Sequence, residues 1–156
     1  MIPSLIEIND APWKILPAGI HRATLSEVEV FFGTNPHRRV LFVGLVQALK
    51  ALRIAGCQRV YLDGSYVTGK PKPNDYDACW EHEGVDADKL DPVFLDFDNL
   101  RANQKAKYGG EFFPRCANGV PGQPILDFFQ RERYSGEIKG ILSIDLTSDL
   151  LLEQES

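Results

Sequence analysis

The chain has 156 residues, of which 44% are hydrophobic and 25% charged, which is the composition of a soluble globular protein with one substantial core. Its formal net charge of −5 argues against a broad basic surface for nucleic-acid binding. Since no apolar run is long enough to cross a membrane and the first residues lack a secretory signal pattern, we expect a cytoplasmic protein with no membrane partner.

Residues 1–23 are the first unit along the chain. Pro3, Pro12 and Pro17 interrupt regular structure there, so we predict an irregular arm with at most one short strand. This arm is expected to pack on a single domain formed by residues 24–156. Its expected anchors are Trp13, Leu16 and Ile20.

The next elements have clear start signals. Thr24-Leu25-Ser26-Glu27 has the spacing of a capping box and predicts a short helix. Asn35-Pro36 supplies an N-cap and a first helical residue for a helix over residues 36–55. Short apolar runs then predict strands near residues 59–63 and 75–81. The first turn of the long helix carries two arginines that we expect to be exposed, Arg38 and Arg39.

The second half of the chain predicts further alternation of helices and strands. The expected elements are a helix over 91–107 capped by Asp91, a strand over 111–116, a loop over 117–124, a short helix over 125–130 and a strand over 138–146. An apolar patch at residues 150–152 is expected to dock on the domain or on another chain. The basic cluster near the end is expected to be a solvated face, and it consists of Arg131, Arg133 and Lys139.

The chemistry of the chain is concentrated between residues 62 and 78. If residues 75–77 are extended, the period of two places Asp75 and Asp77 on one face, with Cα atoms roughly 6.5–7 Å apart. Two carboxylates in this arrangement can hold Mg²⁺, which often bridges protein carboxylates and substrate phosphates. The sequence therefore predicts a site for Mg²⁺ or Mn²⁺.

A phosphate-binding turn is expected beside this metal site. Gly64-Ser65 ends an apolar strand, where backbone N–H groups and the serine hydroxyl can receive a triphosphate. Lys70 and Lys72 follow closely and can offset phosphate charge. The segment Gly64 to Lys70 also has P-loop spacing, but Pro71 stands where a P-loop needs the Mg²⁺-binding hydroxyl, so we set that alternative aside.

Gly64-Ser65, nine residues and then Asp75-Tyr76-Asp77 resembles the signature of the DNA polymerase β-like nucleotidyltransferase superfamily. The chain is similar in size to minimal members of that superfamily, including those that act as antitoxins beside small ribonucleases. It departs from the pattern at Asp63, where a hydrophobic residue is usual. The resemblance implies an α/β (α+β) fold with a central mixed β-sheet flanked by helices.

The resemblance also implies an activity, which is the Mg²⁺-dependent transfer of a nucleoside monophosphate to a hydroxyl of a protein or an RNA. The expected case is transfer of AMP from ATP. Under it, Asp75 and Asp77 are catalytic metal ligands, Gly64 and Ser65 hold phosphates, and a third carboxylate lies on a later strand. Glu111 is the best placed acid for that third position. A toxin protein is one possible acceptor, and the sequence does not choose between protein and RNA. The alternative is an inactive module of the same fold that binds a nucleotide or a partner protein.

Overall fold

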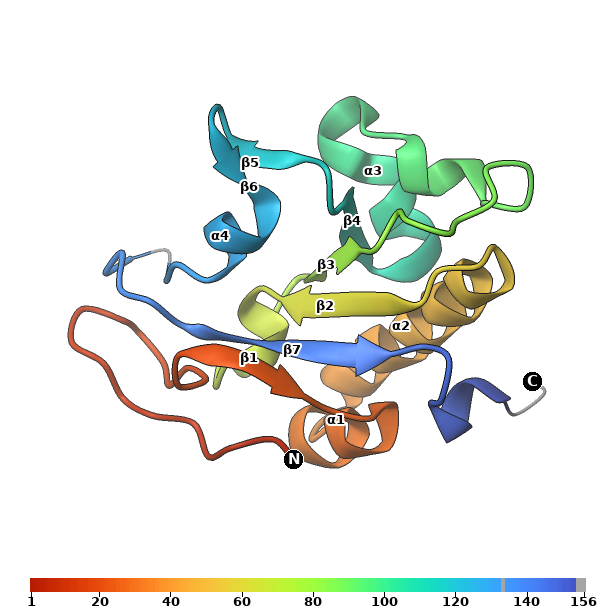
Figure 1. Ribbon diagram of the computed structural model, residues 1–156. Coiled ribbons are helices and arrows are strands. Elements are labelled where there is room, and N and C mark those ends of the chain that lie inside the picture. Colours follow the sequence, from red (N-terminus) through yellow and green to blue (C-terminus); the bar gives the residue numbers. More distant parts are fainter. Residues whose placement is uncertain (133, 154–156) are drawn as a thin grey trace.

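A mixed sheet of five strands forms the centre of the molecule within residues 1–132 and 134–153, which the computed structural model describes (Figure 1). The order across the sheet is β1 (Gly19–Arg22), β7 (Gly140–Asp145), β2 (Arg59–Asp63), β3 (Tyr76–Trp80) and β4 (Gly110–Pro114). β2 runs antiparallel to both of its neighbours, whereas β1 is parallel to β7 and β4 is parallel to β3. The predicted α/β domain with a central mixed sheet flanked by helices is confirmed.

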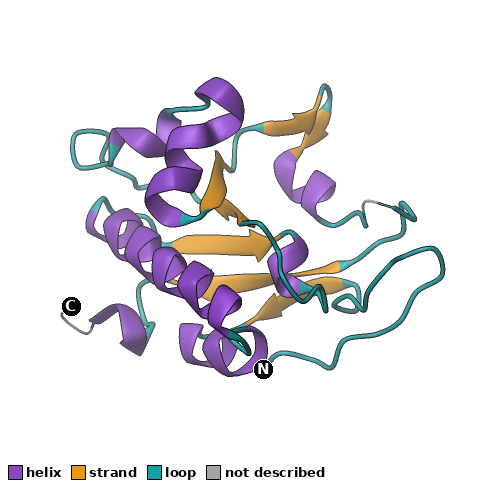
Figure 2. Cartoon of the chain, turned by 180° about the vertical axis from the view of Figure 1, so that it is seen from behind, coloured by secondary structure: helices purple, strands orange, loops and turns teal. Residues whose placement is uncertain are grey.

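Two N-terminal helices begin where their capping residues predict. α1 (Leu25–Phe32) begins after a complete capping box between Thr24 and Glu27. α2 (Pro36–Ile54) begins after Asn35, whose side-chain oxygen accepts the backbone N–H of Arg38 at 2.8 Å. Figure 2 shows α2 lying along one face of the sheet.

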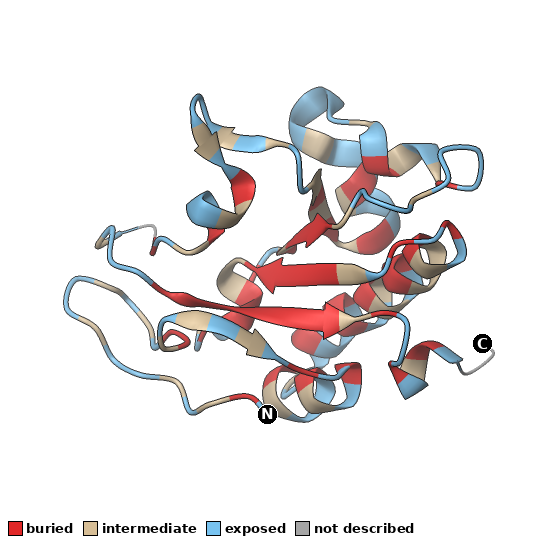
Figure 3. Cartoon of the chain, viewed as in Figure 1, coloured by how far each residue is buried: buried red, intermediate tan, exposed pale blue. Residues whose placement is uncertain are grey.

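The alternation of side chains along the strands divides the core into two parts. Val60, Leu62, Ala78 and Leu142 belong to the main core with α1 and α2. Tyr61, Cys79 and Ile141 point to the opposite face, where they pack against Ile125 and Phe129 of α4 (Ile125–Phe129). The sheet is thus covered on both faces, and its central strands are almost entirely buried (Figure 3).

The region predicted as one helix over 91–107 is two helices, so that prediction was wrong in its continuity. A 3₁₀ turn, η2 (Pro92–Leu95), follows the expected N-cap Asp91, and α3 (Asp98–Tyr108) begins after it. Asp96 interrupts the run because its carboxylate accepts the backbone N–H of Asp98 at 3.1 Å. The first turn of α3 then contains three residues with left-handed backbone angles, Asn99, Leu100 and Arg101.

The loop predicted over 117–124 contains a small hairpin instead, β5 (Asn118–Val120) paired with β6 (Gln123–Pro124). Gly122, with φ of +82°, makes the tight turn between these strands possible. The predicted helix after it and the last strand are confirmed as α4 and β7. The apolar patch at 150–152 docks on the domain itself as η3 (Leu150–Glu153), with Leu152 buried in the main core.

The N-terminal arm does more than pack on the domain, since residues 19–22 are the edge strand β1 of the main sheet. Leu16 is buried as predicted, but Ile20 is 47% exposed and was wrongly chosen as an anchor. Ile20 lies on the exposed side of the edge strand, whereas Ile15 of the same arm is buried. Among the described residues, no helix is long and apolar enough to span a membrane.

Candidate active site

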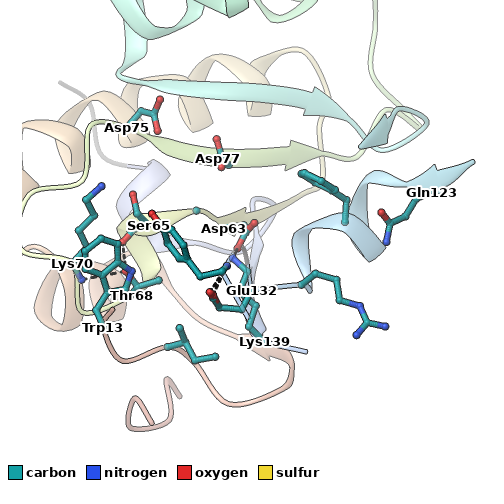
Figure 4. Close-up of a pocket in the computed structure, with 15 residues that line it drawn as sticks. Trp13, Asp63, Ser65, Thr68, Lys70, Asp75, Asp77, Gln123, Glu132 and Lys139 are labelled. Atoms are coloured by element: carbon teal, nitrogen blue, oxygen red, sulfur yellow. Dashed lines mark hydrogen bonds and ion pairs between the residues drawn. The ribbon is translucent and has the colours of Figure 1, made fainter. Parts of the chain in front are cut away.

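A cavity of about 560 Å³ opens where β2 ends and β3 begins. Asp63, Gly64, Ser65, Asp75 and Asp77 form the part of its wall that comes from these strands and their flanking residues (Figure 4). The rest comes from Thr68 and Lys70 after the Gly-Ser turn, from the N-terminal arm and from residues between 123 and 139. The structure therefore brings the two predicted aspartates and the predicted Gly-Ser turn to one cavity.

The strand register explains why carboxylates gather here. Asp77 of β3 is paired with Asp63 of β2 on one side and with Glu111 of β4 on the other. Residues paired across a sheet point to the same face, so all three side chains lie on the face that α4 partly covers. Asp75 directly precedes β3 and also lines the cavity.

Burial and mutual repulsion shift the acidity of this cluster. The pKa of Asp77 is raised from its ordinary value of 3.8 to about 8, first by burial and then by the charges of Asp63, Asp75 and Glu111. Burial, followed by the charge of Glu111, also raises the pKa of Asp75. A cation bound between these two carboxylates would relieve both effects.

Gly64 permits the close contact between the turn and the carboxylate of Asp77. Its φ is +87°, and a Cβ atom built there would lie 2.9 Å from Asp77 Oδ2 and 3.1 Å from the backbone nitrogen of Asp77. The sequence interpretation assigned this glycine to close approach of a triphosphate. The contact present in the structure is with Asp77, so any side chain at position 64 would displace that carboxylate.

The two predicted phosphate-binding lysines differ in position. Lys70 lines the cavity, and its Nζ lies 5.0 Å from the ring centroid of Trp13 in a cation–π contact. Thr68 fixes this segment, because its hydroxyl donates to the Ser65 carbonyl at 2.6 Å and accepts the Lys70 backbone N–H at 3.2 Å. Lys72 is exposed and does not belong to the described lining of the cavity.

Glu111 is held by cations from α3. Its Oε1 lies 3.0 Å from Lys105 Nζ, and its Oε2 lies 3.3 Å from Arg101 Nε. Glu111 is next to Asp77 in register, as expected of a third carboxylate, but it does not contribute to the described lining of the cavity. Both of its oxygens are occupied by these ion pairs.

The described residues contain no group of three or more His, Cys, Asp or Glu placed to hold a metal ion. The pair Asp75 and Asp77 still fits Mg²⁺, because this ion often takes only one or two protein carboxylates and completes its octahedron with phosphate oxygens and water. Both half-buried carboxylates line one cavity, and their burial and the neighbouring negative charge disfavour the ionised forms that a divalent cation would stabilise, which supports such a fit. Glu111 is a metal ligand only if it leaves its ion pairs.

Sequence reasoning missed a buried ion pair between Asp63 and Lys139 at the cavity. Lys139 is 8% exposed, so the prediction that it belongs to a solvated basic face was wrong. Arg131 of the same cluster also lines the cavity, and Arg133 lies outside the described residues. The unusual acid at position 63, in a slot where the signature has a hydrophobic residue, was the available signal for this pair.

The prediction of an exposed Arg38 was also wrong. Arg38 is 3% exposed, and its guanidinium donates hydrogen bonds to four backbone carbonyls. Three of them, Tyr66, Thr68 and Lys70, belong to the segment that leads from the Gly-Ser turn to the aspartates, and the fourth is Phe32. Its neighbour Arg39 is exposed, as expected.

Comparison with known proteins places this architecture in one family. No curated protein and no solved structure matches the chain significantly. Residues 8–145, which include the sheet, the carboxylate cluster and every segment that lines the cavity, match the family described as a family of unknown function, DUF6932. The chain belongs to the DUF6932 family.

Proposed function

We propose that this protein is a Mg²⁺-dependent nucleotidyltransferase with a polymerase β-like fold, which transfers a nucleoside monophosphate, AMP from ATP, to a hydroxyl of a protein or an RNA. The observation that carries the proposal is the junction of β2 and β3 at one cavity. There a Gly-Ser turn and the carboxylates of Asp75 and Asp77 face the same space. The order of helix α2, strand β2, turn and strand β3 also agrees with the resemblance.

Different residues around the cavity would bind the metal ion and the phosphates. Asp75 and Asp77 would hold the metal ion, which neutralises phosphate charge when bound. Ser65 and Lys70 lie on one side of the aspartates, where a hydroxyl and an ammonium can contact phosphate oxygens. In the transfer, the acceptor oxygen bonds to the α-phosphorus, pyrophosphate leaves, and the hydroxyl proton passes to solvent. The chain contributes positioning and charge to this displacement.

A second candidate function is nucleotide binding without transfer, and Glu111 favours it. Both carboxylate oxygens of Glu111 are paired with cations of α3, so the third acid is not free to assist an acceptor. An inactive module of this kind would bind Mg²⁺ and nucleotide, or a partner protein such as a toxin, at the same cavity.

Titration calorimetry with ATP, in the presence and absence of Mg²⁺, tests the Mg²⁺-dependent nucleotide binding that both candidate functions require. We expect binding that requires Mg²⁺ and is lost in Asp77→Asn, with the thermal stability of the variant retained. Absence of Mg²⁺-dependent nucleotide binding by the parent protein would overturn the proposal.

Incubation with α-labelled ATP, Mg²⁺ and either RNA or a protein extract then separates the two candidates. The transferase predicts label attached to one acceptor class and equal release of pyrophosphate, both lost in Asp77→Asn. Binding without label transfer or pyrophosphate release would favour the inactive module.

A further inference from the structure

The cavity has two chemically different ends. Trp13, Ser65 and Lys70 lie toward one side in Figure 4, and Gln123 lies at the opposite side, with Asp63 and Lys139 between them. The first end presents a hydroxyl and an ammonium beside the aspartates. The second end contains Gln123 of β6, Phe128 of α4 and Arg131, which follows α4.

Phe128 is an exposed aromatic ring at this second end. It is 44% exposed although the two apolar residues beside it on α4, Ile125 and Phe129, are buried. One side of the ring lies against the hairpin, because a Cβ atom at Gly119 would approach Phe128 Cγ to 2.2 Å. The ring is therefore held in place, while much of its surface remains available to the cavity that it lines.

The support beneath this ring is rigid. Ile125 and Phe129 pack against Tyr61, Cys79 and Ile141 on the sheet. The backbone N–H of Ile125 also donates to the Ala117 carbonyl at 3.0 Å, which ties α4 to the start of the hairpin. The wall formed by Gln123 and Phe128 is thus fixed relative to the strands that carry the aspartates.

We infer that Gln123 and Phe128 form the binding site for the base of the nucleotide, with Phe128 stacking on the heterocycle and Gln123 forming hydrogen bonds with its edge. Aromatic side chains stack on any nucleobase, and a carboxamide both donates and accepts hydrogen bonds. A cavity of about 560 Å³ with an anion-binding end and an aromatic end suits a ligand of nucleotide size. This inference rests on the proposed function, because it assigns the phosphates to the end near Ser65 and Lys70.

The experiment compares two ligands that share phosphates but not a base. Binding of Mg²⁺-ATP and of Mg²⁺-tripolyphosphate is measured by calorimetry for the parent protein, Phe128→Ala and Phe128→Trp. Phe97→Ala is the matched control, because Phe97 is 43% exposed and lies outside the lining of the cavity. Loss of one stacking ring weakens base binding by about tenfold.

We expect Phe128→Ala to weaken ATP binding about tenfold and to leave tripolyphosphate binding unchanged, and we expect Phe128→Trp and Phe97→Ala to bind both ligands like the parent. The inference is overturned if Phe128→Ala binds ATP normally or weakens both ligands equally. It is also overturned if the parent binds ATP no better than tripolyphosphate. If the parent binds neither ligand, both this inference and the proposed function fail. The other contradicting outcomes overturn the base-binding inference alone and leave the proposed function in place.

Discussion

Asp63 and Lys139 form a buried ion pair that joins the end of β2 to the residue preceding β7, in the wall of the cavity. Asp63 is 5% exposed and Lys139 is 8% exposed, so neither charge is solvated by bulk water. Removing one member leaves the other buried without a partner, which costs about 3–5 kcal/mol, whereas replacing both by apolar residues is often neutral.

We therefore expect Lys139→Met to lower the free energy of unfolding by about 3–5 kcal/mol. The double variant Asp63→Leu with Lys139→Met should recover most of this loss, since it removes both buried charges and leaves neither without a partner. Urea denaturation of the parent, both single variants and the double variant provides the measurement. A Lys139→Met variant as stable as the parent would contradict the burial of this pair.

Asp77 gives the protein a definite dependence on pH. Its pKa is about 8 in the folded protein, mainly because of burial, and 3.8 is the ordinary value that applies to the unfolded chain. Between these values the folded state binds the proton that the unfolded state has lost, so the contribution of Asp77 to stability is largest at low pH and falls as the pH rises toward 8. Asp75, whose pKa is also raised, contributes in the same direction.

The metal-free protein should consequently lose stability between pH 5 and pH 8, at a slope of up to about 1.4 kcal/mol per pH unit for each such proton. In Asp77→Asn this slope should become smaller. Mg²⁺-ATP binding should show the opposite trend and tighten as the pH rises, because the metal competes with the proton on Asp77. Chemical denaturation and calorimetry across this pH range check the two trends, and a pH-independent ATP affinity would argue against Asp77 as a ligand.

Arg38, in the first turn of helix α2, binds the segment that runs from the Gly-Ser turn to Asp75. In Arg38→Lys, a single ammonium replaces five donors, so some of the four carbonyls lose their partner at a cost of about 1–3 kcal/mol. We expect faster amide exchange over residues 66–72 in this variant, together with weaker nucleotide binding. Arg39→Lys, one residue further along and exposed, is the control and should change neither.

Gly64→Ala tests the contact between the turn and Asp77. The new methyl group would meet Asp77 Oδ2 at 2.9 Å, so the carboxylate must move and Mg²⁺-ATP binding should be lost or reduced at least tenfold, which is about 1.4 kcal/mol. Gly84→Ala is a matched control, because Gly84 has φ of +81° and its added Cβ would meet nothing closer than 3.8 Å. If both variants lose binding to the same extent, backbone strain rather than the position of Asp77 determines the effect. If Gly64→Ala binds Mg²⁺-ATP like the parent, the contact with Asp77 does not matter for binding.

Ser65→Ala tests the phosphate contact without moving the aspartates. Loss of one hydroxyl should weaken Mg²⁺-ATP binding by about two- to tenfold, in keeping with a hydrogen bond worth about 0.5–1.5 kcal/mol. Tripolyphosphate binding should fall by the same factor, since this contact does not involve the base. A Ser65→Ala variant that binds both ligands like the parent would remove this serine from the phosphate site.

Local signals in the sequence were sufficient for the elements that surround the site. The caps at Thr24 and Asn35 and the spacing of Gly64-Ser65 from Asp75 involve residues close in the chain, and each predicted its structure correctly. The partners that modify the site are distant in sequence. Lys139 is 76 residues from Asp63 in the sequence, and three of the four carbonyls that bind Arg38 reach it only when the segment after β2 folds back against α2.

A similar limit explains the errors in the second half of the chain. The break before α3 depends on one side-chain hydrogen bond from the backbone of Asp98 to Asp96, which has no periodic signature. The hairpin at 118–124 consists of strands too short to produce an alternating pattern. Glu111 was correctly placed on a strand beside Asp77, but its pairing with Arg101 and Lys105 depends on the fold of α3.

The position of β2 between β7 and β3 has a consequence for biosynthesis. A ribosome releases β2 and β3 long before β7, so the nascent chain carries β2 with one row of backbone N–H and C=O groups unpaired. Asp63 also has no ion-pair partner until Lys139 has been synthesised. A polypeptide that stalls or is cleaved ahead of residue 139 would therefore be an aggregation-prone intermediate for chaperones and proteases to clear, rather than a shortened protein that retains partial activity.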